Sequence, residues 1–147
     1  MKLKSNEFND YFFLPKTCGY NSGNKAPSLF IEDIPNNATS LAMLVFDSDV
    51  IYGDKELTYW LLWNLPPDIG EFSSDNLPSS VVQGTNDMGI VGYSGPMLAR
   101  NIHHVHFLIF ALDIEITLDS SATRNLFDDA VNGKFLEHAS LTGMYQS

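Results

Sequence analysis

A glycine-rich segment that runs directly into a short, strongly apolar segment constrains the fold of this chain most. Residues 84–102 contain one proline, Pro96, and four glycines: Gly84, Gly89, Gly92 and Gly95. This spacing does not fit a regular helix or strand, and it predicts a long loop with backbone positions at positive φ or in close contact. Residues 105–112 (VHFLIFAL) are instead β-branched or aromatic and of strand length. Long ordered loops beside a buried strand often carry binding sites. We therefore predict that this junction, which contains His103, His104 and His106, forms one wall of a site.

Other apolar runs predict further strands. Residues 41–47 (LAMLVFD) and 58–64 (TYWLLWN) are typical of buried strands, and residues 50–57 between them predict a charged loop. Residues 79–83 predict a short strand before the glycine-rich loop. Residues 135–145 fit either a final strand or a short helix followed by a strand, and both interpretations stay open.

One helix is predicted, close to the C-terminus. Ser121 or Thr123 is suited to cap its start, and Gly133 suits a left-handed residue after its end. Its apolar stripe consists of Leu126, Phe127, Ala130 and Val131. Several strands with one helix predict a mostly β, sandwich-like domain over residues 1–147, with a small helical addition.

Charge and cysteine content narrow the classes of function. The net charge is −10 with only eight lysines and arginines, and no basic cluster, which argues against nucleic acid or an anionic membrane as the main partner. Cys18 is the single cysteine, so it cannot form an intramolecular disulfide, and nothing indicates an oxidising compartment. The N-terminal residues have no apolar core typical of a secretion signal, and no window approaches the roughly 20 apolar residues of a membrane span. A cytoplasmic protein without stable membrane insertion is expected.

Six segments, in chain order, share their pattern with a known family. They are 23–29 (GNKAPSL), 40–49 (SLAMLVFDSD), 59–66 (YWLLWNLP), 84–96 (GTNDMGIVGYSGP), 103–113 (HHVHFLIFALD) and 130–145 (AVNGKFLEHASLTGMY). Through them the chain resembles the phosphatidylethanolamine-binding proteins, in particular their bacterial, Raf-kinase-inhibitor-like branch. The resemblance implies a central β-sheet packed on a smaller sheet, with a helix near the C-terminus. It also implies a small pocket at the mouth of the sheet that holds phosphate-like or carboxylate anions, including phospholipid head groups.

Carried over residue by residue, the resemblance gives a set of candidate ligand-binding residues. Asp47 and Asp49 match the two acids of the family, and their expected role is to orient and charge a donor such as a histidine. The alternative is that both are solvated turn acids. His103 matches a pocket histidine of the family. Arg100 could bind the anion through its forked guanidinium group, and the alternative is that Arg100 is simply exposed to solvent. The full candidate set is Asp47, Asp49, Tyr59, Gly92, Tyr93, Gly95, Pro96, Arg100 and His103.

The pocket departs from the family pattern at several positions. Tyr59 stands where the family has a histidine, and a tyrosine can donate one neutral O–H bond but cannot become a cation near pH 7. His104 replaces an arginine, and Val105 replaces a tyrosine and offers no donor. Residues 97–99 (MLA) replace a proline pair, which exchanges a rigid wall for flexible apolar surface. The usual anion pocket is therefore expected to be remodelled.

These observations predict a non-enzymatic binding domain for an anionic or phosphorylated head group, which could also modulate a kinase or another signalling partner. The alternative is a protein-interaction or inhibitor module in which apolar loop residues contact the partner protein. These residues are Met88, Ile90, Met97 and Leu98. The resemblance also implies that a homodimer can form. No cofactor is predicted. A metal site on His104 and His106, completed by His138 or an aspartate, is less favoured because such sites usually need three or four ligands. Catalysis is not expected, since Cys18 has no local base and no G-x-S-x-G motif occurs.

Overall fold

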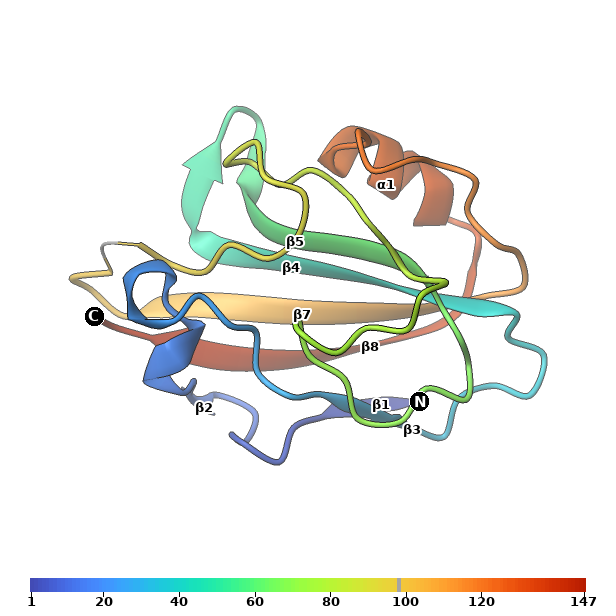
Figure 1. Ribbon diagram of the computed structural model, residues 1–147, viewed down its shortest axis with the longest axis horizontal. Helices are drawn as coiled ribbons and strands as arrows, with labels where there is room; N and C mark the ends of the chain where they lie inside the picture. The colour runs from blue at the N-terminus through green and yellow to red at the C-terminus, as the bar shows by residue number, and fades with distance from the viewer. Residues whose placement is uncertain (98) are drawn as a thin grey trace.

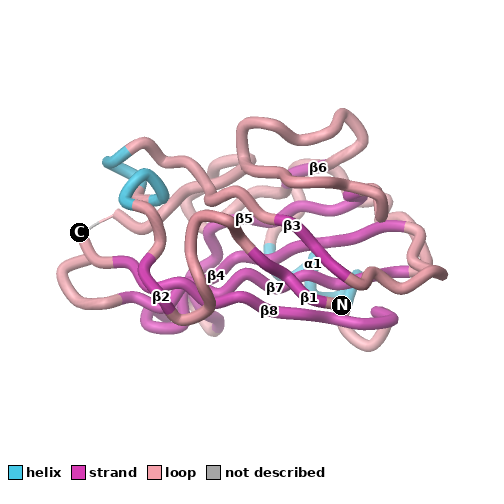
Figure 2. The backbone as a smooth tube through the Cα atoms, turned by 90° about the horizontal axis from the view of Figure 1, so that it is seen from below, coloured by secondary structure: helices cyan, strands magenta, loops and turns pink. Residues whose placement is uncertain are grey.

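The computed structural model describes residues 1–97 and 99–147, which form a large, mainly antiparallel sheet, a small second sheet and one α-helix (Figures 1 and 2). The elements in chain order are β1 (Lys2–Lys4), β2 (Phe12–Phe13), the 3₁₀ turns η1 (Lys16–Cys18) and η2 (Tyr20–Ser22), β3 (Phe30–Glu32), β4 (Ser40–Tyr52), β5 (Lys55–Leu65), β6 (Val82–Gln83), β7 (His103–Leu112), α1 (Arg124–Val131) and β8 (Phe135–Tyr145). The strands of the large sheet lie in the order β2-β8-β7-β4-β5-β6, and β1 pairs with β3 in the small sheet. The predicted mostly β fold is confirmed.

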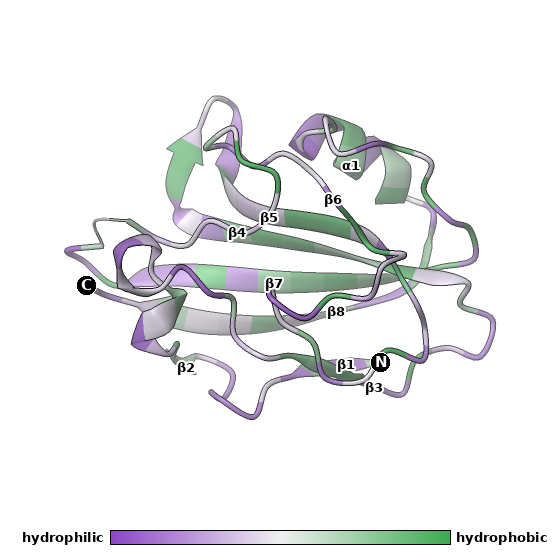
Figure 3. Ribbon diagram, in the orientation of Figure 1, coloured by the Kyte–Doolittle hydropathy of each residue, from purple (hydrophilic) through white to green (hydrophobic). Residues whose placement is uncertain are grey.

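Three of the four long strands of the large sheet, β4, β5 and β7, correspond to the apolar runs in the sequence (Figure 3). Both strands predicted at residues 41–47 and 58–64 are confirmed, and each is longer than the apolar run alone. The loop expected over residues 50–57 was wrong, because β4 and β5 continue through most of it and form a hairpin. Residues 135–145 form one strand, β8, which pairs with β7 along its length.

The two faces of the large sheet bury different cores, because successive strand residues point to opposite faces. One face carries Val45, Trp60 and Phe107, and the small sheet of β1 and β3 covers it through residues such as Leu3. The other face packs against α1 (Figure 1). Fully burying each large apolar side chain stabilises the fold by about 1.5–3 kcal/mol, so both layers stabilise the sheet.

Helix α1 contains the whole predicted apolar stripe, from Leu126 to Val131. Thr123 occupies the N-cap position, although its side chain makes no capping hydrogen bond. Phe127 and Val131 are buried against the sheet, whereas Leu126 is 50% exposed, so its assignment to the buried stripe was wrong. Gly133 follows with φ of 73°, as predicted for the residue that ends the helix. None of the helices in the described residues is long and apolar enough to cross a membrane.

Candidate functional site

A buried carboxylate lies where β4, β5 and β7 meet at one end of the large sheet. The strand register places Asp47 of β4 opposite Val105 of β7, and Tyr59 lies on the neighbouring strand β5. Asp47 is fully buried. Its Oδ2 accepts the hydroxyl hydrogen of Tyr59 at 2.7 Å and lies 2.6 Å from Nδ1 of His103, while its Oδ1 accepts the backbone N–H of Asp49 at 2.9 Å. Three predicted site residues, Asp47, Tyr59 and His103, are thus brought together.

The direction of these hydrogen bonds fixes what each group can offer a ligand. An ionised carboxylate only accepts hydrogen bonds, so beside it Nδ1 of His103 carries a hydrogen. Burial, and then the charge of Asp47, raise the pKa of Tyr59 well above its ordinary value of 10.0. The Tyr59 hydroxyl therefore stays protonated, and its hydrogen is committed to Asp47. The ring atom of His103 that is left for a ligand is Nε2.

A pocket of about 170 Å³ lies in front of this group. Its lining is mostly apolar, and Tyr59 and His103 supply the hydrogen-bonding side chains among the described residues that line it. The His103 side chain is 18% exposed, so it is reachable but largely desolvated. The lining residues are Val50, Leu57, Tyr59, Met88, Gly95, Pro96, Met97, Ala99 and His103.

The glycine-rich loop forms the wall through close backbone contacts. A Cβ at Gly95 would lie 1.8 Å from the carbonyl oxygen of Cys18, so no larger residue fits there without a shift of the backbone. The Tyr93 hydroxyl donates to the same carbonyl at 2.7 Å, and its ring packs edge-on against Trp60. Tyr93 and Gly92, which has φ of 119°, therefore build the loop behind the pocket and are not among its lining residues.

Asn86 is a residue that the sequence analysis missed. Its amide nitrogen donates to the carbonyl oxygens of Tyr59 at 3.2 Å and Gly92 at 3.0 Å, and its Oδ1 accepts the N–H groups of Met88 and Ile90. It thereby ties the loop to β5. The preference of asparagine for hydrogen bonding to nearby backbone in a turn was the available clue.

Two other candidates lie away from the pocket lining. Arg100 is exposed, and its backbone carbonyl accepts a hydrogen bond from the Gln146 side chain at 2.8 Å. The Asp49 carboxylate, unlike that of Asp47, is 41% exposed and accepts bonds from the backbone N–H and the Nδ1 of His104, at 2.7 and 2.9 Å. Burial raises the pKa of Asp49, but these bonds from His104 outweigh it and leave the pKa below its ordinary value. Asp49 therefore orients His104 instead of His103. Of the predicted apolar loop residues, Leu98 lies outside the described residues.

His104 and His106 lie on the sheet face opposite to His103. His106 packs on the Phe46 ring with 5.0 Å between ring centres, and its nitrogens bond to Thr142 and Ser48. Burial, and then the proximity of His104, lower the pKa of His106 below its ordinary value of 6.5. Within residues 1–97 and 99–147, no group of three or more metal-ligating side chains is close enough to hold an ion.

Comparisons with known proteins agree with this architecture. A family model described as phosphatidylethanolamine-binding protein matches residues 4–146. The chain belongs to the phosphatidylethanolamine-binding protein (PEBP) family. The resemblance found in the sequence is therefore confirmed over nearly the whole chain.

Relatives of this PEBP-family chain occur in archaea and bacteria. A UPF0098 protein of Methanothermobacter thermautotrophicus is 33% identical over 99% of both chains, and one of Pyrococcus horikoshii is 33% identical over 99% of this chain and 77% of its own. Among crystal structures, a putative PEBP homologue of Chlamydia trachomatis superposes with a TM-score of 0.91, at 27% identity over 99% of this chain and 97% of its own. Escherichia coli YbcL, described as a new member of the mammalian PEBP family, gives 0.89 at 27% identity over 99% and 98%.

Proposed function

We propose that this PEBP-family domain binds a small ligand in the pocket that His103 lines, with an anionic or phosphoryl group of the ligand held by Nε2 of His103. The domain then acts by binding its ligand and not by catalysis. The observation that carries the proposal is the buried contact between Asp47 and Nδ1 of His103. It fixes the ring so that Nε2 is the atom left for a ligand. The apolar wall supplied by Val50, Leu57 and Met97 would take the non-polar part of the ligand.

Protonation of His103 decides what this atom can hold. In the neutral ring with hydrogen on Nδ1, Nε2 is a bare acceptor, whereas in the imidazolium it is a charged donor. A charged hydrogen bond contributes about 1.5–3 kcal/mol, which corresponds to about one to two decades in Kd. The exposed Asp49 carboxylate and the net charge of −10 oppose an anion, and salt screens the long-range part. An anion should therefore bind on Nε2 only when the His103 ring carries hydrogens on both nitrogens.

A two-dimensional NMR titration at low salt tests this proposal. Inorganic phosphate and then phosphoethanolamine are added to the wild type, to His103→Ala and to the matched control His138→Ala, whose exposed histidine lies outside the pocket lining. Saturable shifts at Asp47, Tyr59, residues 92–97 and His103 are expected, lost in His103→Ala and kept in His138→Ala. Shifts that persist in His103→Ala, or no saturable shift at millimolar ligand, would contradict it.

Exposed apolar side chains support a second candidate function, docking of a protein partner such as a kinase. Met88, Ile90, Val91 and Met97 are 42, 38, 54 and 36% exposed, and Met88 and Met97 also line the pocket. Apolar side chains gathered at one exposed site are typical of interaction surfaces. A pull-down from a lysate of the organism that makes the chain, followed by titration of the purified partner, tests it. Binding should survive His103→Ala and be lost in the double variant Met88→Ser with Ile90→Ser, and the reverse pattern would exclude this surface.

A further inference from the structure

One edge of the large sheet is largely uncovered. Strand β8 pairs with β7 along its whole length, but on its other side β2 pairs only with Gly143 and Met144. Because β2 is a two-residue strand, the part of β8 that precedes Thr142 forms an open edge of the sheet.

The hydrogen bonds of Thr142 show which backbone groups point toward this edge. Its N–H donates to the carboxylate of Asp10 at 2.8 Å, and its carbonyl accepts the N–H of Tyr11 at 2.6 Å. Backbone groups of a strand alternate in direction with a period of two residues, so the N–H and C=O of Ser140 and His138 point the same way. In the described part of the chain, no strand pairs with β8 at these two residues on that side.

The chain's own N-terminal segment covers this edge only beside Thr142, Gly143 and Met144. Tyr11 has φ of 62°, an uncommon conformation for a bulky residue, and the N–H of Phe12 closes a turn onto the carbonyl of Asn9 at 2.9 Å. The backbone before β2 therefore turns away from β8 instead of continuing along it. The pairing of Phe12 and Phe13 with Gly143 and Met144 is parallel, which shows that this edge accepts a parallel strand.

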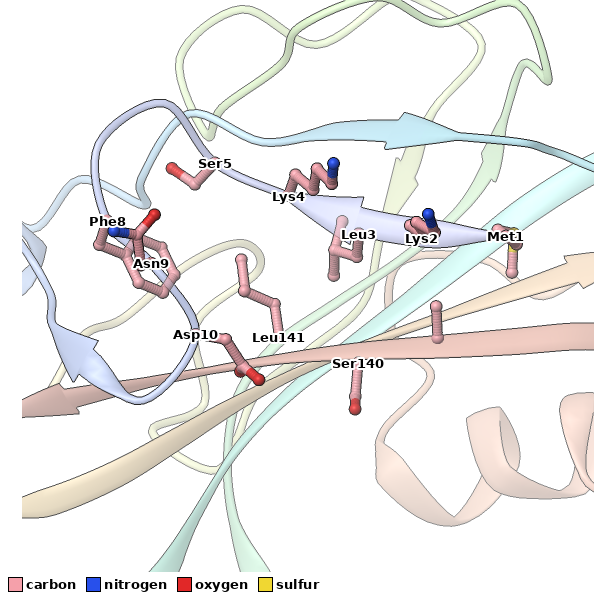
Figure 4. A pocket seen from close by; sticks show the side chains of 11 residues that line it. Met1, Lys2, Leu3, Lys4, Ser5, Phe8, Asn9, Asp10, Ser140 and Leu141 are labelled. Carbon is pink, nitrogen blue, oxygen red and sulfur yellow. The ribbon is translucent and has the colours of Figure 1, made fainter.

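A pocket of about 470 Å³ lies beside the same edge, between β1 and β8 (Figure 4). Figure 4 shows Leu3 of β1 and Leu141 of β8 directed toward one another across it, with the Phe8 ring at one end. Ser140, whose backbone belongs to the open edge, also lines it. Unpaired backbone groups thus lie directly next to a hollow whose lining is part apolar, through Leu3, Phe8 and Leu141, and part polar, through residues such as Lys4 and Asp10.

We propose that the open edge of β8 binds an extended peptide segment of a partner protein as an added parallel strand, with one apolar side chain placed in the cavity beside Leu3, Phe8 and Leu141. An extended backbone is the chemical complement of a free strand edge, because it alternates donors and acceptors at the same spacing. Main-chain bonds then supply affinity and the adjacent cavity supplies selectivity, as in other strand-addition complexes. The peptide would continue along β8 the pairing that β2 provides for only two residues.

Two blocked synthetic peptides test this on the full chain. One alternates threonine and leucine, and the other has the same sequence with every second backbone amide N-methylated, which removes the edge-facing donors. In the wild type we expect saturable amide shifts at His138 and Ser140 and slower hydrogen exchange of these amides, with affinity weakened about tenfold or more by N-methylation. Equal binding of the two peptides, or shifts centred on His103, would overturn the proposal.

A chain variant gives an independent measurement. Ser140→Pro removes an N–H that points away from β7, so the β7–β8 ladder keeps its bonds, and proline is tolerated on strand edges. Binding of the unmodified peptide should weaken about two- to twelvefold in this variant, because one main-chain hydrogen bond is lost. Unchanged binding in folded Ser140→Pro would overturn the proposal. So would a concentration-dependent dimer that gives the same His138 and Ser140 shifts without peptide, because the occupant would then be a second copy of the chain.

Discussion

Replacement of the buried carboxylate by its neutral isostere, Asp47→Asn, tests the organisation of the site most directly. Asp47 accepts three hydrogen bonds in the folded protein, from Tyr59, His103 and the backbone of Asp49. A bond to a charged acceptor contributes about 1.5–3 kcal/mol and a neutral one about 0.5–1.5 kcal/mol. The substitution thus loses about 1 kcal/mol at each of three bonds, or about 3 kcal/mol in all. Relief of the desolvated charge offsets part of this, so we expect the free energy of unfolding to fall by about 2–3 kcal/mol.

The same substitution should also change the tautomer of His103. The backbone N–H of Asp49 holds the amide oxygen at the place of Oδ1, so the amide NH₂ faces His103 and Tyr59. In a neutral ring, Nδ1 must then accept, and the hydrogen moves to Nε2. Side-chain ¹⁵N NMR distinguishes the two tautomers, and a urea denaturation series gives the free energy of unfolding. A loss of 2–3 kcal/mol corresponds to a fall in Tm of about 4–12 °C for a domain of this size.

Asp49→Asn is the matched control. Its carboxylate is 41% exposed, so the substitution should change stability by less than about 1 kcal/mol and leave the tautomer of His103 as it is. The reasoning is refuted if Asp47→Asn is as stable as the wild type, if both variants lose the same amount, or if His103 keeps its hydrogen on Nδ1 when the amide replaces the carboxylate.

Two further predictions concern the loop and the opposite face of the sheet. Gly95→Ala should lower the free energy of unfolding by at least about 2 kcal/mol, because the added Cβ would overlap the Cys18 carbonyl and displace two hydrogen-bonded contacts of the loop. Urea denaturation measures this loss. It should show no such loss for the control Gly70→Ala, because no atom lies within 4 Å of a Cβ built at Gly70. Because the pKa of His106 is lowered in the folded protein, the unfolded chain takes up a proton on His106 more readily than the folded protein does. The contribution of neutral His106 to stability is therefore present above the ordinary histidine pKa of 6.5 and is lost as the pH falls below that value. The wild type should therefore lose more stability between about pH 7.5 and 5 than His106→Gln does, and equal slopes in urea denaturation at each pH would contradict this.

Strands whose apolar content is unambiguous could be predicted from the sequence alone. The runs within β4, β5 and β7 are continuous stretches of apolar residues, and each forms a strand. Residues 135–145 could not be assigned, because their apolar residues fit more than one period. Their conformation is set by the continuous ladder with β7, which is a tertiary interaction and leaves no local signature.

The sequence predicted which residues form the site, but it could not predict the direction of the hydrogen bonds between them. The motif resemblance placed Asp47, Tyr59 and His103 together, as the structure does. The irregular pairing of β4 and β5 between Val45 and Phe46 determines where Tyr59 points, and a β-bulge of this kind cannot be read from residue types alone. The exposed position of Arg100 likewise depends on the path of the loop.

The tyrosine at position 59 has a consequence for the pocket as a whole. An unpaired buried carboxylate would cost several kcal/mol, and the Tyr59 hydroxyl supplies one of the three hydrogen bonds that satisfy Asp47. A tyrosine that donates its only hydrogen to Asp47 has none left for a ligand, and fully buried Val105 adds no donor. What the pocket can still vary is the proton on Nε2 of His103. Recognition of charge therefore rests on one ring atom in an apolar wall, and loss of the His103 ring should remove anion binding more completely than loss of one donor would in a pocket with several fixed donors.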